Sequence, residues 1–172
     1  VYFKCQGYPK VDKAIEYLID HYAGLDIVIA DLCLAPEQVE LCCKNFNSVR
    51  YFDHHQESQD IELMVASSLW DSTNLEVIYH PNLCSTALVY RYWIQRYGGK
   101  PTPALSHFAQ VVEVYDNWRT ENPLWNESYG MNELFWKDGF FDFVKIFKDG
   151  FEEFQEEEQI YIDQKKAGKV AQ

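Results

Sequence analysis

Two histidines and an aspartate follow directly after a short run of residues typical of a β-strand. The run is Val49–Phe52, and the polar triplet is Asp53–His55. Short segments rich in β-branched and aromatic residues favour strands, so we expect the triplet at the carboxyl end of a strand. Open α/β sheets bind their ligands at that end. Two imidazoles and a carboxylate suit a divalent transition metal and a phosphate, and a polar turn or helix cap is the alternative interpretation.

A second apolar run, Leu25–Ala30, ends in Asp31 and also predicts a strand. The segment Leu34–Lys44 lies between the two runs, and its Pro36 suits the first turn of a helix. Strand, helix and strand in this order predict parallel strands joined by a right-handed crossover. We therefore expect Asp31 and the triplet at the same edge of the sheet, although an aspartate after a strand is also a common helix cap.

Two further segments have helical spacing. Apolar residues in Val11–Tyr22 recur at helical intervals after a short run, Val1–Phe3, that suits a strand. Pro103–Tyr115 has the same spacing and ends at Asp116. A carboxylate is disfavoured at a helix carboxyl end, so we expect a nearby positive group such as a metal ion or Arg119; a solvated turn is the alternative.

These patterns predict an α/β fold with a mainly parallel sheet flanked by helices. We expect this domain to span residues 1–150, and an acidic carboxyl-terminal helix and tail to span residues 151–172, with the helix over Phe151–Ile162. With 172 residues and 47% hydrophobic residues, the chain can bury a sizeable core.

The order of the motifs resembles that of the DHH phosphoesterase family. Asp31 closes one strand, Asp53–His55 closes the next, and the segment Cys84–Tyr90 and then Asp116 follow. The resemblance covers roughly Leu25–Asp116. This family includes single-strand-specific exonucleases, nanoRNases, cyclic dinucleotide phosphodiesterases and manganese pyrophosphatases. The resemblance therefore implies a metal-dependent hydrolase that cleaves a phosphodiester or phosphoanhydride.

The resemblance also implies a role for each site residue. Asp31 would bridge two metal ions, His54 would bind one of them, and Asp116 would bind or bridge them. Asp53 and His55 would be the catalytic residues: Asp53 would orient the metal site, and His55 would contact the substrate phosphate. Such ligands suit two Mn²⁺ ions, with Mg²⁺ or Co²⁺ as alternatives, and two ions can activate water for in-line attack on a phosphoester.

Ser85 and Thr86 stand before an apolar segment that predicts a helix. Either hydroxyl could cap that helix. If the amino terminus of the helix faces the metal edge, the same residues would bind substrate phosphate.

One motif of the family is absent. A His-x-x-x-Asp-x-Asp pattern should precede the Asp31 strand, and residues 1–24 do not contain it. We expect that this sequence is an amino-terminally incomplete piece of a longer protein, and that the piece alone is inactive. The alternative is a non-catalytic structural or regulatory protein that retains the fold.

Net charge and composition limit the classes of substrate and the cellular locations that we expect. A net charge of −12 disfavours a broad basic groove for long nucleic acid, so we expect a small phosphoester, a dinucleotide or a short oligonucleotide as substrate. No apolar stretch approaches the roughly 20 residues of a membrane span. Five cysteines without paired metal-finger spacing suit reduced thiols in a cytoplasmic protein.

Overall fold

The structure, a computed structural model, describes residues 10–67 and 73–170. The chain divides into two compact units, Val1–Val89 and Tyr90–Gln172. The boundary expected between a phosphoesterase domain at residues 1–150 and an acidic helix and tail at residues 151–172 stays a prediction.

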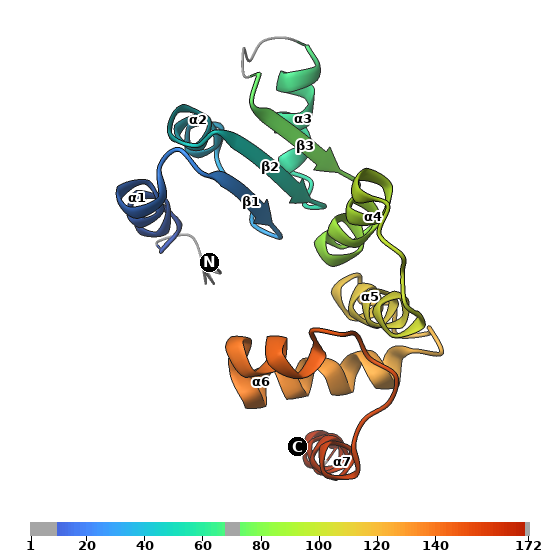
Figure 1. Cartoon of the computed structure of the whole chain (residues 1–172). Helices are drawn as coiled ribbons and strands as arrows, with labels where there is room; N and C mark the ends of the chain where they lie inside the picture. The colour runs from blue at the N-terminus through green and yellow to red at the C-terminus, as the bar shows by residue number, and fades with distance from the viewer. Residues whose placement is uncertain (1–9, 68–72, 171–172) are drawn as a thin grey trace. The chain divides into compact units, whose positions relative to one another are not determined.

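Helices and strands alternate in the first unit (Figure 1). Its elements are α1 (Val11–Tyr22), β1 (Asp26–Ala30), α2 (Pro36–Asn45), β2 (Ser48–Asp53), α3 (Ser58–Ala66), β3 (Leu75–Tyr79) and the start of α4 (Ser85–Tyr97). The strands form a parallel sheet in the order β1-β2-β3. The predicted α/β class and the parallel β-α-β unit are therefore confirmed. The strand expected at Val1–Phe3 lies outside the described residues.

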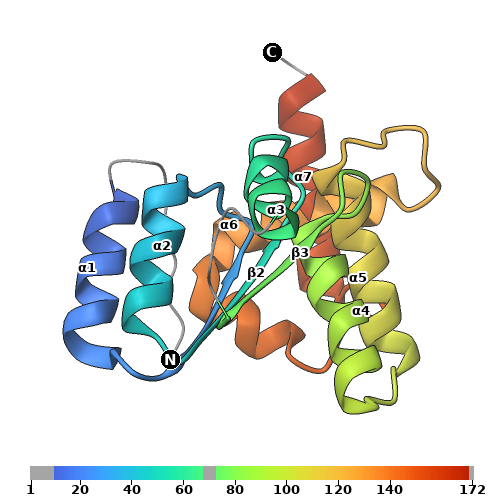
Figure 2. The ribbon, with the colours of Figure 1, turned by 90° about the horizontal axis from the view of Figure 1, so that it is seen from above.

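Local signals set the start of α2. Pro36 occupies the first turn, where a missing N–H costs nothing. The side chain of Gln38 turns back and accepts a hydrogen bond from the N–H of Ala35 at 2.8 Å. The amide of Gln38 also donates to Asp12 of α1 at 2.6 Å. These contacts join α1 and α2, which lie side by side (Figures 1 and 2).

The core of the first unit lies on one face of the sheet. Alternate residues of the three strands point to that face, and the parallel register aligns Ile29 with Tyr51 and Tyr51 with Val77. Side chains of α1, α2 and α3 pack against them. The buried members of this core are Val11, Ile15, Ile29, Leu34, Val39, Cys42, Phe46, Val49, Tyr51 and Ile61. The packing holds β1 and β2 in one register, so their carboxyl ends meet at one edge.

The second unit is helical where the structure describes it. It contains the rest of α4, then α5 (Pro103–Asp116), α6 (Trp125–Phe147) and α7 (Glu156–Val170). Its buried core consists of Val111, Met131, Leu134, Phe147, Phe151 and Ile162. The helix expected at Pro103–Tyr115 is confirmed as α5, whereas α6 was not predicted. Helical geometry in α6 is interrupted at Gly139, where φ is +74°.

The acidic helix begins later than predicted. Phe151 was expected inside it but is a buried core residue before α7. Gly150 adopts φ +106°, and a Cβ there would collide with the backbone of Ala104 and Leu105. The N–H of Phe151 donates to the carbonyl of Ala104 at 3.0 Å, so this connection is fixed against α5. The prediction failed because tertiary contacts hold Phe151 in the core of the second unit.

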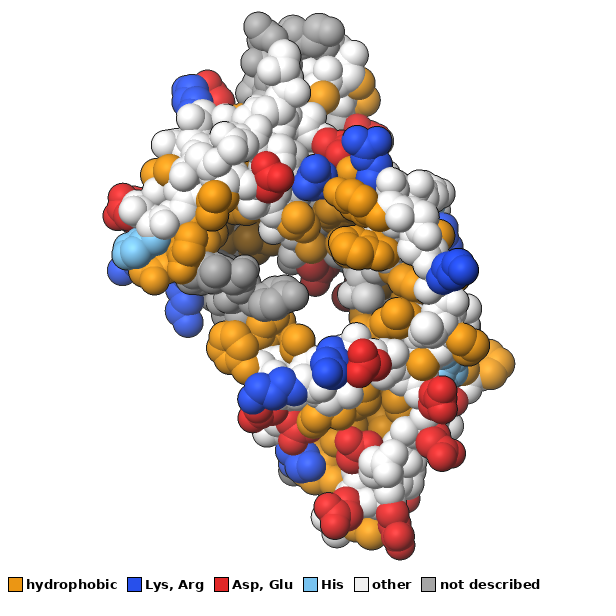
Figure 3. All heavy atoms as spheres, in the orientation of Figure 1, with side chains coloured by type: hydrophobic (Ala, Val, Ile, Leu, Met, Phe, Trp, Pro, Cys, Tyr) orange, Lys and Arg blue, Asp and Glu red, His pale blue; other side chains and the backbone are white. Residues whose placement is uncertain are grey.

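Acidic side chains gather around the start of α7, as the lower part of Figure 3 shows. The segment before α7 and its first turn contribute Glu152, Glu153, Glu156, Glu157 and Glu158. Among the described residues, no helix is both long and apolar enough to cross a membrane.

Candidate metal centre

Asp31 follows β1 in an unusual backbone conformation. Its φ is +58°, in the left-handed region that few residues other than glycine adopt. Its N–H still donates to the carbonyl of Phe52 at 3.1 Å, so the residue stays tied to β2. The side chain is exposed. Backbone strain of this kind clusters at functional sites, because the surrounding structure must hold it in place.

Asp53 ends β2 with a carboxylate that is only 1% exposed. Its Oδ1 accepts a hydrogen bond from Nδ1 of His55 at 2.7 Å. Its Oδ2 accepts from the Ser58 hydroxyl and lies 3.3 Å from the Tyr51 hydroxyl. A buried carboxylate is costly unless such donors surround it. Asp53 is therefore a fixed anchor for the side chains around it.

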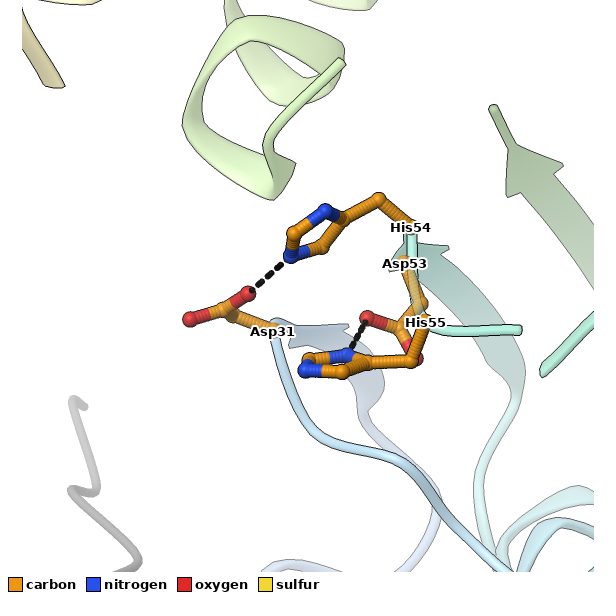
Figure 4. Close-up of side chains that lie close together, drawn as sticks. All are labelled: Asp31, Asp53, His54 and His55. Atoms are coloured by element: carbon orange, nitrogen blue, oxygen red, sulfur yellow. Dashed lines mark hydrogen bonds and ion pairs between the residues drawn. The ribbon is translucent and has the colours of Figure 1, made fainter. Parts of the chain in front are cut away.

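The ring orientation of His55 follows from this contact. An ionised carboxylate only accepts hydrogen bonds, so Nδ1 of His55 carries a hydrogen. Nε2 is then left on the far side of the ring, where it can meet a metal or a substrate oxygen (Figure 4). Carboxylate–imidazole pairs of this kind commonly orient histidines in metal sites.

Four side chains converge at the shared edge of β1 and β2 (Figure 4). Each of Asp31, Asp53, His54 and His55 offers one potential ligand atom, and these atoms all lie within 4.8 Å of one another. Nε2 of His54 is 3.4 Å from Oδ1 of Asp31. Neighbouring ligands of a divalent ion lie roughly 3 Å apart, so this pair fits a shared ion. The mixed oxygen and nitrogen donors suit a transition metal such as Mn²⁺.

Ser85 was predicted as a helix cap or a phosphate ligand. Its buried hydroxyl instead donates to Oδ1 of Asp31 at 3.2 Å. The capping contact comes from Cys84, whose Sγ accepts from the N–H of Ala87 at 3.4 Å. The capping interpretation of Ser85 is therefore wrong, because the residue before it already caps the helix. Thr86 follows as a half-buried residue of α4. Binding of phosphate by either hydroxyl stays a prediction.

Asp116 is the exposed last residue of α5 and belongs to the second unit. The chain turns sharply after it, with Trp118 at φ +51°. Arg119 forms an ion pair with Glu113 at 2.9 Å. The proposed role of Asp116 as a metal ligand stays a prediction.

Sequence reasoning missed two residues of this site, Tyr51 and Ser58. The hydroxyl of Tyr51 lies 2.7 Å from that of Ser58, and both side chains are fully buried. The sequence carried a signal for Tyr51, because residues two apart on a strand share a face and Asp53 is two positions on. Ser58 carried none, since the helix that it begins was not predicted.

Burial disfavours ionisation of two side chains in the first unit, Cys42 and Tyr51. Burial, with a smaller effect of Cys43, raises the pKa of the Cys42 thiol to about 12. Burial likewise raises the pKa of Tyr51, although its hydrogen bonds with Ser58 and Leu34 partly oppose the shift. Both side chains are therefore neutral near pH 7 and act through packing and hydrogen bonding.

Comparison with known proteins gives one distant relative. The chain is 28% identical over 112 residues to oligoribonuclease NrnB of Bacillus subtilis (strain 168). The match covers 63% of this chain and 27% of the relative, so the chain spans about a quarter of that protein. No family model matches the chain, and no solved structure matches it.

Proposed function

We propose that the protein is a metal-dependent phosphoesterase of the DHH type, and that it hydrolyses phosphodiester bonds in short oligonucleotides. The observation that carries this proposal is the convergence of Asp31, Asp53, His54 and His55 at the carboxyl edge of two parallel strands. Such an edge is where α/β sheets bind ligands. The similarity to an oligoribonuclease supports a nucleotide substrate.

The residues divide into ligands and supports. Asp31 and His54 would bind Mn²⁺, and further ligands would be needed for a second ion. When bound, the metal would supply a Lewis acid for the phosphoryl oxygens and would lower the pKa of a coordinated water. Asp53 would act from within the core, because its buried carboxylate fixes the ring of His55.

His55 would face the substrate. Its Nδ1 is held by Asp53, so the ring presents Nε2 outward in one orientation. When both ring nitrogens carry a hydrogen, a hydrogen bond from Nε2 to a phosphoryl oxygen would place the scissile group beside the metal ligands. A fixed donor costs little reorganisation as charge develops on the phosphoryl oxygens.

The negative net charge of the protein favours short substrates. The net charge of −12 gives little attraction for a long polyanion, whereas a dinucleotide carries few phosphates. We therefore assign short oligonucleotides and dinucleotides as the substrate class. A cytoplasmic location suits this assignment.

The test is hydrolysis of a diribonucleotide by the natural full-length protein with Mn²⁺. His54→Ala should abolish the activity and leave the far-ultraviolet circular dichroism unchanged. His21→Ala is the matched control, since His21 is an exposed residue of α1 whose ring meets Tyr17, and it should keep full activity. Equal activity in both variants would refute the proposal.

A further inference from the structure

The hydroxyl of Tyr51 connects parts of the chain that the metal cluster depends on. It accepts a hydrogen bond from the N–H of Leu34 at 3.2 Å and lies 2.9 Å from the carbonyl of Leu32. Both groups belong to the loop after Asp31. On its other side the hydroxyl contacts Ser58 at 2.7 Å and Asp53 at 3.3 Å. The phenol oxygen of Tyr51 thus contacts both the loop after Asp31 and the buried pair, Ser58 and Asp53, that holds the triplet.

The hydrogens available explain why this contact is rigid. Tyr51 and Ser58 each have one hydroxyl hydrogen. Ser58 donates to Asp53, and the hydrogen of Tyr51 can go to the Leu32 carbonyl or to Ser58. In either arrangement the phenol oxygen remains bonded on both sides. The Tyr51 side chain is 0% exposed, so water cannot replace a lost contact without opening the core.

The loop needs this support because Asp31 is strained. Its left-handed backbone places the carboxylate near His54, at 3.4 Å. Leu32 is the next residue, so fixing its carbonyl restrains the peptide that follows Asp31. The N–H of Asp31 is restrained separately by Phe52. Asp31 is therefore held on both sides: its own N–H bonds to Phe52 of β2, and the carbonyl of the next residue, Leu32, bonds to Tyr51.

We propose that Tyr51 is a positioning residue for the metal: its hydroxyl sets the spacing between Asp31 and the Asp53–His55 triplet. This inference rests on the proposed function, because it assumes that the cluster binds an ion. Removing the hydroxyl keeps all four side chains of the Asp31, Asp53, His54 and His55 cluster but lets the two sides of the site move apart. Loss of a group that orients metal ligands typically weakens metal affinity about 10- to 100-fold.

The experiment compares Tyr51→Phe with Tyr90→Phe. Tyr90 is a matched control because its hydroxyl also meets a serine, Ser106, at 2.6 Å, and it lies in the second unit. Calorimetric titration with Mn²⁺ should give an affinity about 10- to 100-fold weaker for Tyr51→Phe and unchanged for Tyr90→Phe. Equal Mn²⁺ affinity in wild type and Tyr51→Phe would overturn the proposal.

A second measurement is made on the metal-free protein by nuclear magnetic resonance. In Tyr51→Phe, the amide of Asp31 should exchange with solvent about tenfold faster or more, and the ring of His55 should lose its preference for a hydrogen on Nδ1. In Ser58→Ala, which leaves Tyr51 bonded to Leu32 and Leu34, the His55 ring should change while the Asp31 amide does not.

The two measurements distinguish failure of the proposed function from failure of the positioning role of Tyr51. A wild-type protein that binds no Mn²⁺ would refute the proposed function. The positioning role of Tyr51 is then judged by the metal-free protein alone. Unchanged Asp31 exchange and an unchanged His55 ring in Tyr51→Phe would show that the hydroxyl positions neither side.

Discussion

Substituting Ser58 by alanine should weaken the first unit by an amount that follows from its contacts. The Ser58 hydroxyl is fully buried and donates to the buried carboxylate of Asp53. A hydrogen bond to a charged group contributes about 1.5–3 kcal/mol. The Tyr51 hydroxyl keeps the Leu32 carbonyl as an acceptor, so the loss falls on the Asp53 carboxylate. The ratio of folded to unfolded first unit should therefore fall roughly 10- to 150-fold.

The assay must report on the first unit. Trp118, Trp125 and Trp136 lie in the second unit, so tryptophan fluorescence would mainly follow that part. Amide hydrogen exchange of β2 residues, measured without metal, reports the free energy of opening the sheet. Ser67→Ala is the control, since Ser67 is exposed and bonds only locally to the Met64 carbonyl at 3.1 Å, and it should change stability by less than about 0.5 kcal/mol. If the two variants differ by less than that, the buried contact to Asp53 does not stabilise the unit as argued.

Two other predictions concern pH and substrate length. Burial raises the pKa of the Cys42 thiol to about 12, so the folded state favours the protonated thiol. The free energy of unfolding should hold below the pKa of the unfolded thiol, about 8.5, and should fall as pH rises toward 12. Urea unfolding of Cys42→Ala should show a smaller loss of stability at alkaline pH. An equally steep loss in that variant would contradict the assignment. Turnover by the natural full-length protein should fall as substrates lengthen from dinucleotides to about twenty nucleotides, and a preference for long strands with steep salt dependence would reveal a basic path instead.

The parts of the fold with a clear local signal were predictable. Apolar runs marked β1 and β2, and Pro36 marked the start of α2. Local signals were weaker for β3 and α6. The apolar run Leu75–Tyr79 is interrupted by the charged residue Glu76. Glu76 forms an ion pair with Arg50 of β2 at 3.6 Å, and a local sequence pattern cannot predict that contact. In α6, the left-handed Gly139 interrupts the helical spacing.

The same distinction applies to the site. Parallel strands bring their carboxyl ends together, so the meeting of Asp31 with the triplet followed from the order of elements. The contact between the Tyr51 and Ser58 hydroxyls joins a strand to a helix seven residues on, and the contact from Ser85 to Asp31 joins side chains 54 residues apart. Packing decides such contacts, and secondary-structure patterns do not encode them. Sequence therefore predicted that Asp31 meets Asp53, His54 and His55, and it missed how these side chains are held.

The central claim is that this edge of the sheet binds a divalent metal through His54. Pulsed electron paramagnetic resonance of Mn²⁺ bound to the protein tests it directly, because coordinated imidazole nitrogens modulate the signal of the manganese spin. We predict a histidine nitrogen modulation in the wild-type protein and in His21→Ala, and its loss in His54→Ala. Bound Mn²⁺ with no nitrogen modulation, or with the same modulation in His54→Ala, would contradict the account.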